Sequence, residues 1–254
     1  MKRVAILSFS VASYAVFFAT FLYAIGFVGN VAVPKALDSA PDANVATAVA
    51  IDLALLALFA LQHSIMARPF FKRWLTKFIP QAAERSVYVL ASSVALIALM
   101  ALWEPIGGVV WSLDSTVART IMYSLFAFGW LLVLVTTFLI NHFDLFGLRQ
   151  AWRTFRDTPY QPLVFVTPWL YRVVRHPLYV GWLFAFWATP TMTASHLFFA
   201  SMTTMYILIA IQLEERDLIA MHPEYEQYQA KVPMLIPRIL PARKDARDLQ
   251  HEGR

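Results

Sequence analysis

Three segments in the C-terminal half of the sequence carry side chains that could bind a charged small molecule. The first reads R-H-P-L-Y-V-G from Arg175 to Gly181. Pro177 suits the first turn of a helix, where its missing N–H is harmless. We therefore expect Arg175 and His176 at a helix N-terminus, which favours an anion, with Tyr179 one turn further on. An interfacial anchor, with a snorkelling Arg and a Tyr in the aromatic belt, is the open alternative.

The second segment is the acidic pair Glu214 and Glu215, which follows a long apolar run. Carboxylates at a helix C-terminus are unfavourable, so this pair needs a partner or a function. If the apolar run forms a helical hairpin, the pair returns to the side of Arg175 and His176. Opposite charges facing one site suit a zwitterion with a carboxylate and an amino group. A structural salt bridge between the two arms is the alternative.

The third segment is the tail, in which Tyr225 and Tyr228 are three residues apart on a short amphipathic helix. A Pro-bounded apolar run, V-P-M-L-I-P from Val232 to Pro237, follows it. We expect this run to fold back against the rest of the chain, where it could cover a site.

The composition predicts the elements that position these side chains. Of the 254 residues, 59% are hydrophobic, 15% are charged and none is Cys. Missing Cys excludes disulfides, zinc–thiolate sites and a cysteine nucleophile. The net charge of +5 has no aromatic-interleaved patch that would indicate nucleic acid binding. Apolar runs long enough to span a bilayer, which takes about 20 residues, are Val4–Val28, Val45–Met66, Val87–Trp103, Thr120–Ile140 and Leu178–Leu213.

The last apolar run is long enough for two short passes. We expect it to bend at Thr189-Pro190-Thr191 into arms Leu178–Thr189 and Ala194–Leu213, because Pro interrupts a helix. The predicted fold is an all-α integral membrane protein of five to six membrane-embedded helices, the last two forming a hairpin, with a cytoplasmic cofactor site. Asp52, the formal charge inside the second run, is expected to be structural and paired with Ser or Tyr from a neighbouring helix.

The basic residues predict the orientation. Residues 1–3, 67–86, 141–177 and 214–254 hold 19 of the 21 Lys and Arg residues. Alternate loops are therefore basic, which by the positive-inside rule predicts an inner-membrane protein with both termini in the cytoplasm. The first apolar run is too long for a signal peptide, so we expect a retained helix.

The three C-terminal segments together resemble the signature of the isoprenylcysteine carboxyl methyltransferase and phospholipid methyltransferase superfamily. The signature is R-H-P-x-Y-x-G, a hydrophobic hairpin, E-E, Y-x-x-Y and V-P-x-x-I-P, all present in order. The resemblance implies an enzyme that uses S-adenosylmethionine. It places the cofactor in residues 141–254 and the acceptor in the four helices of residues 1–140. The implied cofactor contacts are Arg175, His176, Tyr179, Gly181, Glu214 and Glu215.

Further sequence segments narrow the resemblance to the bacterial methanethiol S-methyltransferase family, which makes dimethyl sulfide from methanethiol. These segments lie within Phe21–Asn30, Gln62–Pro69, Pro80–Tyr88 and Asn141–Gln150. The implied partners are a small thiol and the lipid bilayer, with neither metal nor nucleic acid. Displacement at a sulfonium requires the nucleophile, the methyl group and the sulfur to lie in line, and it does not require a metal. The nucleophile is the thiolate.

The implied reaction requires a proton acceptor near the thiol. His142 and Asp144 are the first choice, with Arg149 favouring the thiolate or holding the loop. The alternative is a helix-end cap built with Asn141. His63 is the second choice, and its alternative is a satisfied core histidine. Residues expected on the substrate side are His63, Arg85, Tyr88 and Asn141.

Two other functions stay open on the sequence. The same cofactor chemistry could act on a prenylcysteine carboxylate or a lipid amine, which would need a groove open to lipid. A non-catalytic membrane subunit or a small-solute transporter is the alternative from another class. A transporter is expected to show paired broken helices in two repeated halves, and the sequence has no such pattern.

Overall fold

The computed structural model describes residues 1–161, 163 and 166–238. Within these residues, five helices are long and apolar enough to cross a membrane. They are α1 (Lys2–Gly29), α2 (Val45–Ala67), α4 (Gln81–Leu102), α5 (Thr116–Ile140) and α9 (Ala194–Met221). At about 1.5 Å per residue, each exceeds the roughly 30 Å of bilayer hydrocarbon. The predicted all-α membrane fold is confirmed.

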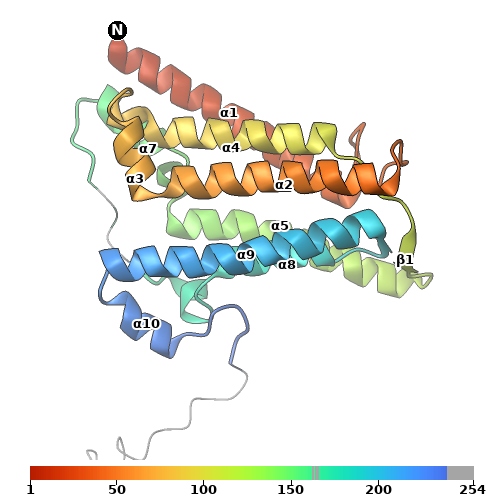
Figure 1. The fold of residues 1–254 in the computed structure, drawn as a ribbon. Coiled ribbons are helices and arrows are strands. Elements are labelled where there is room, and N and C mark those ends of the chain that lie inside the picture. The colour runs from red at the N-terminus through yellow and green to blue at the C-terminus, as the bar shows by residue number, and fades with distance from the viewer. Residues whose placement is uncertain (162, 164–165, 239–254) are drawn as a thin grey trace, which may run out of the picture.

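The long helices lie side by side in one bundle (Figure 1). Several begin at a polar side chain that caps a free backbone N–H group. Asn44 accepts from Thr47 at the start of α2, Ser115 from Ala118 at the start of α5, and Thr193 from His196 at the start of α9. Shorter elements join the helices: α3 (Pro69–Leu75), α6 (His142–Leu145), α7 (Leu148–Phe155), the 3₁₀ helix η1 (Trp169–Arg172) and α10 (Tyr225–Lys231).

The predicted hairpin is present as α8 (Pro177–Trp187) and α9. The first arm is short, as expected, and its 11 residues cross only part of a bilayer. The turn between the arms contains β2 (Thr191–Thr193), which pairs antiparallel with β1 (Val109–Ser112). The sequence analysis did not predict this small sheet. It ties the hairpin turn to the connection between α4 and α5.

The two ends of the bundle differ in charge. Met1, α3, α7 and α10 lie at one end, and β1 lies at the other (Figure 1). The charged end therefore collects the basic segments that the sequence analysis grouped, as far as the structure describes them. The hairpin's second arm continues beyond the predicted Leu213 to Met221. Arg68 holds this extension through a salt bridge of 2.7 Å to Asp217.

Asp52 is fully buried in α2. Its Oδ1 accepts a hydrogen bond of 2.8 Å from the backbone N–H of Glu104, just after α4. The role is structural, as predicted, but the expected Ser or Tyr partner is wrong. The chain leaving a helix needs acceptors for backbone N–H groups, and in an apolar bundle a buried carboxylate supplies one.

Candidate active site

The predicted C-terminal residues come together at the charged end, and Glu215 lies at their centre. Its side chain is only 6% exposed. Its Oε1 lies 2.6 Å from Arg175 Nε and 2.8 Å from His176 Nε2. Gln229 donates to Oε2 at 2.8 Å, and Tyr225 donates to Oε1 at 3.3 Å. Glu215 is therefore satisfied by the protein itself, which matches the alternative of a salt bridge between the arms.

Arg175 also fixes the tail. Its Nη1 donates to the carbonyl oxygens of Gln229 at 3.1 Å and Val232 at 2.6 Å. The backbone N–H groups of Arg175 and His176 donate to Pro233 and Met234. The V-P-M-L-I-P run thus folds back against the motif, as predicted.

Glu214 differs from its neighbour. It is half-buried and accepts a hydrogen bond of 2.9 Å from the Tyr179 hydroxyl. No cation pairs with it among the residues that the structure describes. Burial raises the pKa of Tyr171, and the nearby Glu214 carboxylate raises it further, so the phenol stays neutral. A carboxylate among aromatic rings is a suitable environment for an organic cation.

Gly181 does not face this cluster of charges. A Cβ there would lie 2.9 Å from the carbonyl oxygen of Gly129, and one on Gly129 would lie 2.5 Å from the Ala185 nitrogen. The two glycines let α8 and α5 approach closely. The geometry of Gly181 favours this contact between helices, and its implied contact with the cofactor stays a prediction.

The Gly129→Ala variant is expected to lose about 1–3 kcal/mol of stability, because the added methyl group meets backbone atoms that cannot rotate away. Thermal unfolding of the detergent-solubilised protein measures this. Gly29→Ala is the control, since its methyl group would meet side chains, the rim of the Phe126 ring and Val31, rather than backbone atoms. Equal melting temperatures for the two variants would contradict the close crossing.

A second polar cluster lies inside the bundle between α2 and α4. The Tyr88 hydroxyl is 2.9 Å from His63 Nε2 and 3.0 Å from Nδ1. Ser92 Oγ lies 3.2 Å from Nδ1 and also accepts from Gln62 Nε2 at 3.3 Å. Beside this cluster, Ser64 of α2 bonds Tyr206 of α9 and Arg68 bonds the Leu213 carbonyl oxygen, so this end of α2 lies against the part of α9 that leads to Glu214. The structure thus brings the predicted substrate-side residues His63 and Tyr88 together.

His142 occupies a third place, at the end of α5. Thr137 donates its hydroxyl hydrogen to Leu134 O at 2.7 Å, so His142 Nδ1, 2.8 Å away, must donate to Thr137. The other nitrogen, Nε2, lies 2.7 Å from the Tyr14 hydroxyl. Burial lowers the pKa of His142, and its ring stacks on Phe138. Both nitrogens are engaged, so the geometry favours an anchoring role, and the catalytic role stays a prediction.

The remaining residues of this region hold one another. Asp144 accepts from Arg149 at 2.9 Å and from the Tyr160 hydroxyl at 3.1 Å, and neither of its oxygens bonds His142. Asn141 Oδ1 accepts from the Asp144 N–H at 3.2 Å. Asn141 is therefore a helix cap, as the alternative interpretation expected, and Arg149 holds the loop. Roles for these residues in catalysis or substrate binding stay predictions.

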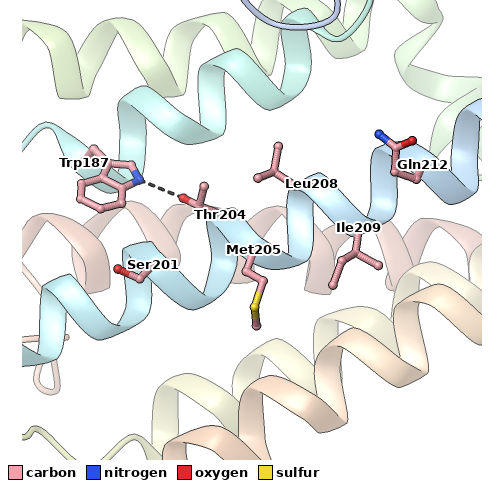
Figure 2. Close-up of a pocket in the computed structure, with 7 residues that line it drawn as sticks. All are labelled: Trp187, Ser201, Thr204, Met205, Leu208, Ile209 and Gln212. Atoms are coloured by element: carbon pink, nitrogen blue, oxygen red, sulfur yellow. Dashed lines mark hydrogen bonds between the residues drawn. The ribbon is translucent and has the colours of Figure 1, made fainter.

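Two hollows lie near or beside these clusters, and the first shares Tyr160 with the Asp144 group. One, of about 520 Å³, has Arg85 in its wall; the full lining is Gln81, Ala82, Glu84, Arg85, Gln150, Thr154 and Tyr160. The other, of about 600 Å³, is an open groove along α9 (Figure 2), where Trp187 donates to Thr204 at 2.9 Å. The groove contains none of the predicted site residues.

Sequence reasoning missed several contributors to the site, namely Gln229, Tyr171, Tyr206 and Tyr160. Tyr206 had a detectable signal, because it precedes Glu214 by eight residues and so lies two turns away on the same helix face. Its hydroxyl is 3.0 Å from Ser64 Oγ of α2. Gln229 and Tyr171 lie in the short helices α10 and η1, and Tyr160 lies between α7 and η1, where the segments are too short for periodicity to single them out. No group of three potential metal ligands occurs in the described part of the chain.

The long apolar helices and the buried charge cluster at one end define a helical integral membrane protein. The chain is 56% identical to methanethiol S-methyltransferase of Crocosphaera subtropica, over 94% of each chain. It is 50% identical to methanethiol S-methyltransferase of Mycobacterium tuberculosis, over 93% of this chain and 98% of that one. The chain belongs to the methanethiol S-methyltransferase family.

A more distant relative is Nurim of Sus scrofa, at 30% identity over 72% of each chain. No family model matches the chain. No solved structure matches it either.

Proposed function

We propose that this protein methylates methanethiol to dimethyl sulfide in the membrane, with S-adenosylmethionine as the methyl donor. The identity of 56% to a methanethiol S-methyltransferase over 94% of each chain carries the proposal. When bound, the donor supplies a methyl group on a positively charged sulfur that leaves as a neutral thioether. The task of this chain's residues is then to hold two small molecules in line and to exclude water.

The charged cluster at the end of the bundle fits such a donor. The donor carries two positive groups, an ammonium and a sulfonium, and Glu214 is a half-buried carboxylate without a cationic partner in the described part of the chain. We assign Glu214 and Tyr179 to direct contact with a positive group. Arg175 and His176 already bind Glu215, so we assign them to the wall that orients this contact.

The acceptor is expected between the N-terminal helices and this cluster. Methanethiol has few groups that can form polar contacts, so its site should be small and mostly apolar. The polar cluster of His63 and Tyr88 is our candidate for its polar side, because the adjoining turn of α2 contacts α9 next to Glu214.

We further propose that the charged end lies in the cytoplasm of a bacterial inner membrane, because Lys and Arg concentrate there. Reporter fusions after Arg3, Lys77, Arg156 and Arg243 should all report the cytoplasm. Fusions near Asp38 and Ser112 should report the opposite side. A periplasmic signal after Lys77 would contradict the proposed orientation.

The direct test of function is dimethyl sulfide in the headspace of cells that express the protein and receive methanethiol. Calorimetric titration of the purified protein with S-adenosylmethionine tests the donor separately. Production of dimethyl sulfide together with saturable binding is expected. Binding without dimethyl sulfide would leave a methyltransferase with another acceptor, and absence of both would contradict the proposal.

A further inference from the structure

The proposed reaction needs a group that takes the thiol proton, and the histidines of the described structure differ in their ability to do so. Four of them already bond other groups or lie at other places in the fold. His142 lies at the end of α5, where it bonds Thr137 and Tyr14 of α1, and His176 binds Glu215. His196 binds Asp38 and the Phe186 carbonyl near the start of α9, and His222 lies beyond its end, near Glu224. His63 remains, and it faces the interior of the bundle.

One tautomer of His63 satisfies Ser92 and leaves a ring nitrogen as an acceptor. Ser92 Oγ can accept two bonds, one from Gln62 Nε2 at 3.3 Å and one from His63 Nδ1 at 3.2 Å. With Nδ1 as the donor, Nε2 is left with its lone pair toward the Tyr88 hydroxyl at 2.9 Å. The ring stacks on Phe59, which fixes its plane. His63 is thus held as a neutral acceptor.

Tyr88 connects this acceptor to the site of methyl transfer. Its phenol extends from α4 toward α2, and the next turn of α2 meets α9 beside Glu214, where Arg68 Nη1 donates to the carbonyl oxygen of Leu213 at 3.3 Å. Both Tyr88 and His63 are only partly buried. Beside them, Gln62 Oε1 is a buried acceptor without a partner among the described residues. Buried polar atoms are normally satisfied, so this atom indicates that a polar or S–H-bearing molecule belongs there.

We infer that Tyr88 and His63 form the proton relay of the thiol acceptor, an inference that rests on the proposed function. The S–H bond of methanethiol breaks and its proton passes to the Tyr88 oxygen, while the Tyr88 proton passes to His63 Nε2. The thiolate sulfur then bonds the methyl carbon, and the bonding pair of the broken C–S bond stays with the sulfur of the donor. His63 later returns the proton through Tyr88 to water.

The test compares two acceptors of nearly equal size. Methanethiol must lose a proton, whereas methaneselenol is already ionised at neutral pH and needs no base. Tyr88→Phe and His63→Asn should lower turnover of methanethiol by about 10²–10⁴-fold, the usual value of acid–base assistance. Turnover of methaneselenol should change little. A relay explains this difference, whereas a purely structural role for the pair would affect both acceptors equally.

The control is Tyr123→Phe, the same change on an exposed tyrosine of α5. Melting temperature and affinity for S-adenosylmethionine should match the unsubstituted protein in every variant. Equal losses on both acceptors, or retained methanethiol turnover in Tyr88→Phe, would overturn the relay. If His63→Asn does not fold, or if methaneselenol is not accepted, the relay is judged by the methanethiol turnover of Tyr88→Phe, a nearly isosteric change. Failure of the unsubstituted protein to make dimethyl sulfide would instead contradict the proposed function.

Discussion

Replacing Glu215 with alanine is expected to destabilise the charged end of the bundle by about 3–5 kcal/mol, the usual cost of leaving a buried charge without its partner. Arg175 is 10% exposed and would lose the carboxylate that faces its Nε. His176, Tyr225 and Gln229 would lose the same acceptor. The tail that Arg175 holds should detach before the helices unfold.

Thermal unfolding in detergent and proteolysis of the tail both measure this effect. Glu226→Ala is the matched control, because Glu226 is an exposed carboxylate on α10. Its effect should stay within about 0.5 kcal/mol, as for most surface changes. If Glu215→Ala melts at the same temperature as the control, the buried ionic network does not stabilise the fold.

The Glu214→Gln variant is expected to weaken binding of S-adenosylmethionine by about 10- to 100-fold at nearly unchanged stability. A hydrogen bond to a charged group contributes roughly 1.5–3 kcal/mol, and about 1.4 kcal/mol corresponds to tenfold in affinity. The amide can still accept the bond of 2.9 Å from Tyr179, so only the charge is lost. No described residue depends on that charge for an ion pair.

Calorimetric titration gives the affinity, and Asp217→Asn is the matched control. It removes one negative charge from the same end of α9, where Asp217 pairs with Arg68 rather than facing the cluster. Its affinity for the donor should stay close to that of the unsubstituted protein. Equal affinities for Glu214→Gln and Asp217→Asn would show that Glu214 does not contact the donor.

The sequence alone determined the membrane architecture. A span needs about 20 apolar residues because the bilayer has a fixed thickness. The run Val45–Met66 therefore predicted α2 to within one residue, and Thr120–Ile140 predicted α5 except for its first turn, which begins at Thr116. Pro190 and the return of the hairpin also brought Glu214 and Glu215 to Arg175 and His176. These predictions depend on composition and chain direction, which a sequence displays directly.

The tertiary structure decided what each site residue contacts. Glu214 and Glu215 are adjacent and chemically alike, yet successive residues of a helix point about 100° apart. One is therefore enclosed by Arg175, and the other faces Tyr179. Whether His142 is free for catalysis likewise depended on Tyr14, which precedes it by 128 residues.

Packing partners could not be read from the pattern of apolar residues. In a soluble protein, a helix shows which face is buried because its other face is polar. Here Phe18 and Leu22 are exposed side chains of α1, while Phe27 of the same helix is buried in the core. Lipid and protein interior both accept apolar side chains, so the sequence of a membrane helix gives its span but not its neighbours. Only the assembled bundle determined that Gly181 meets Gly129 and that Tyr88 meets His63.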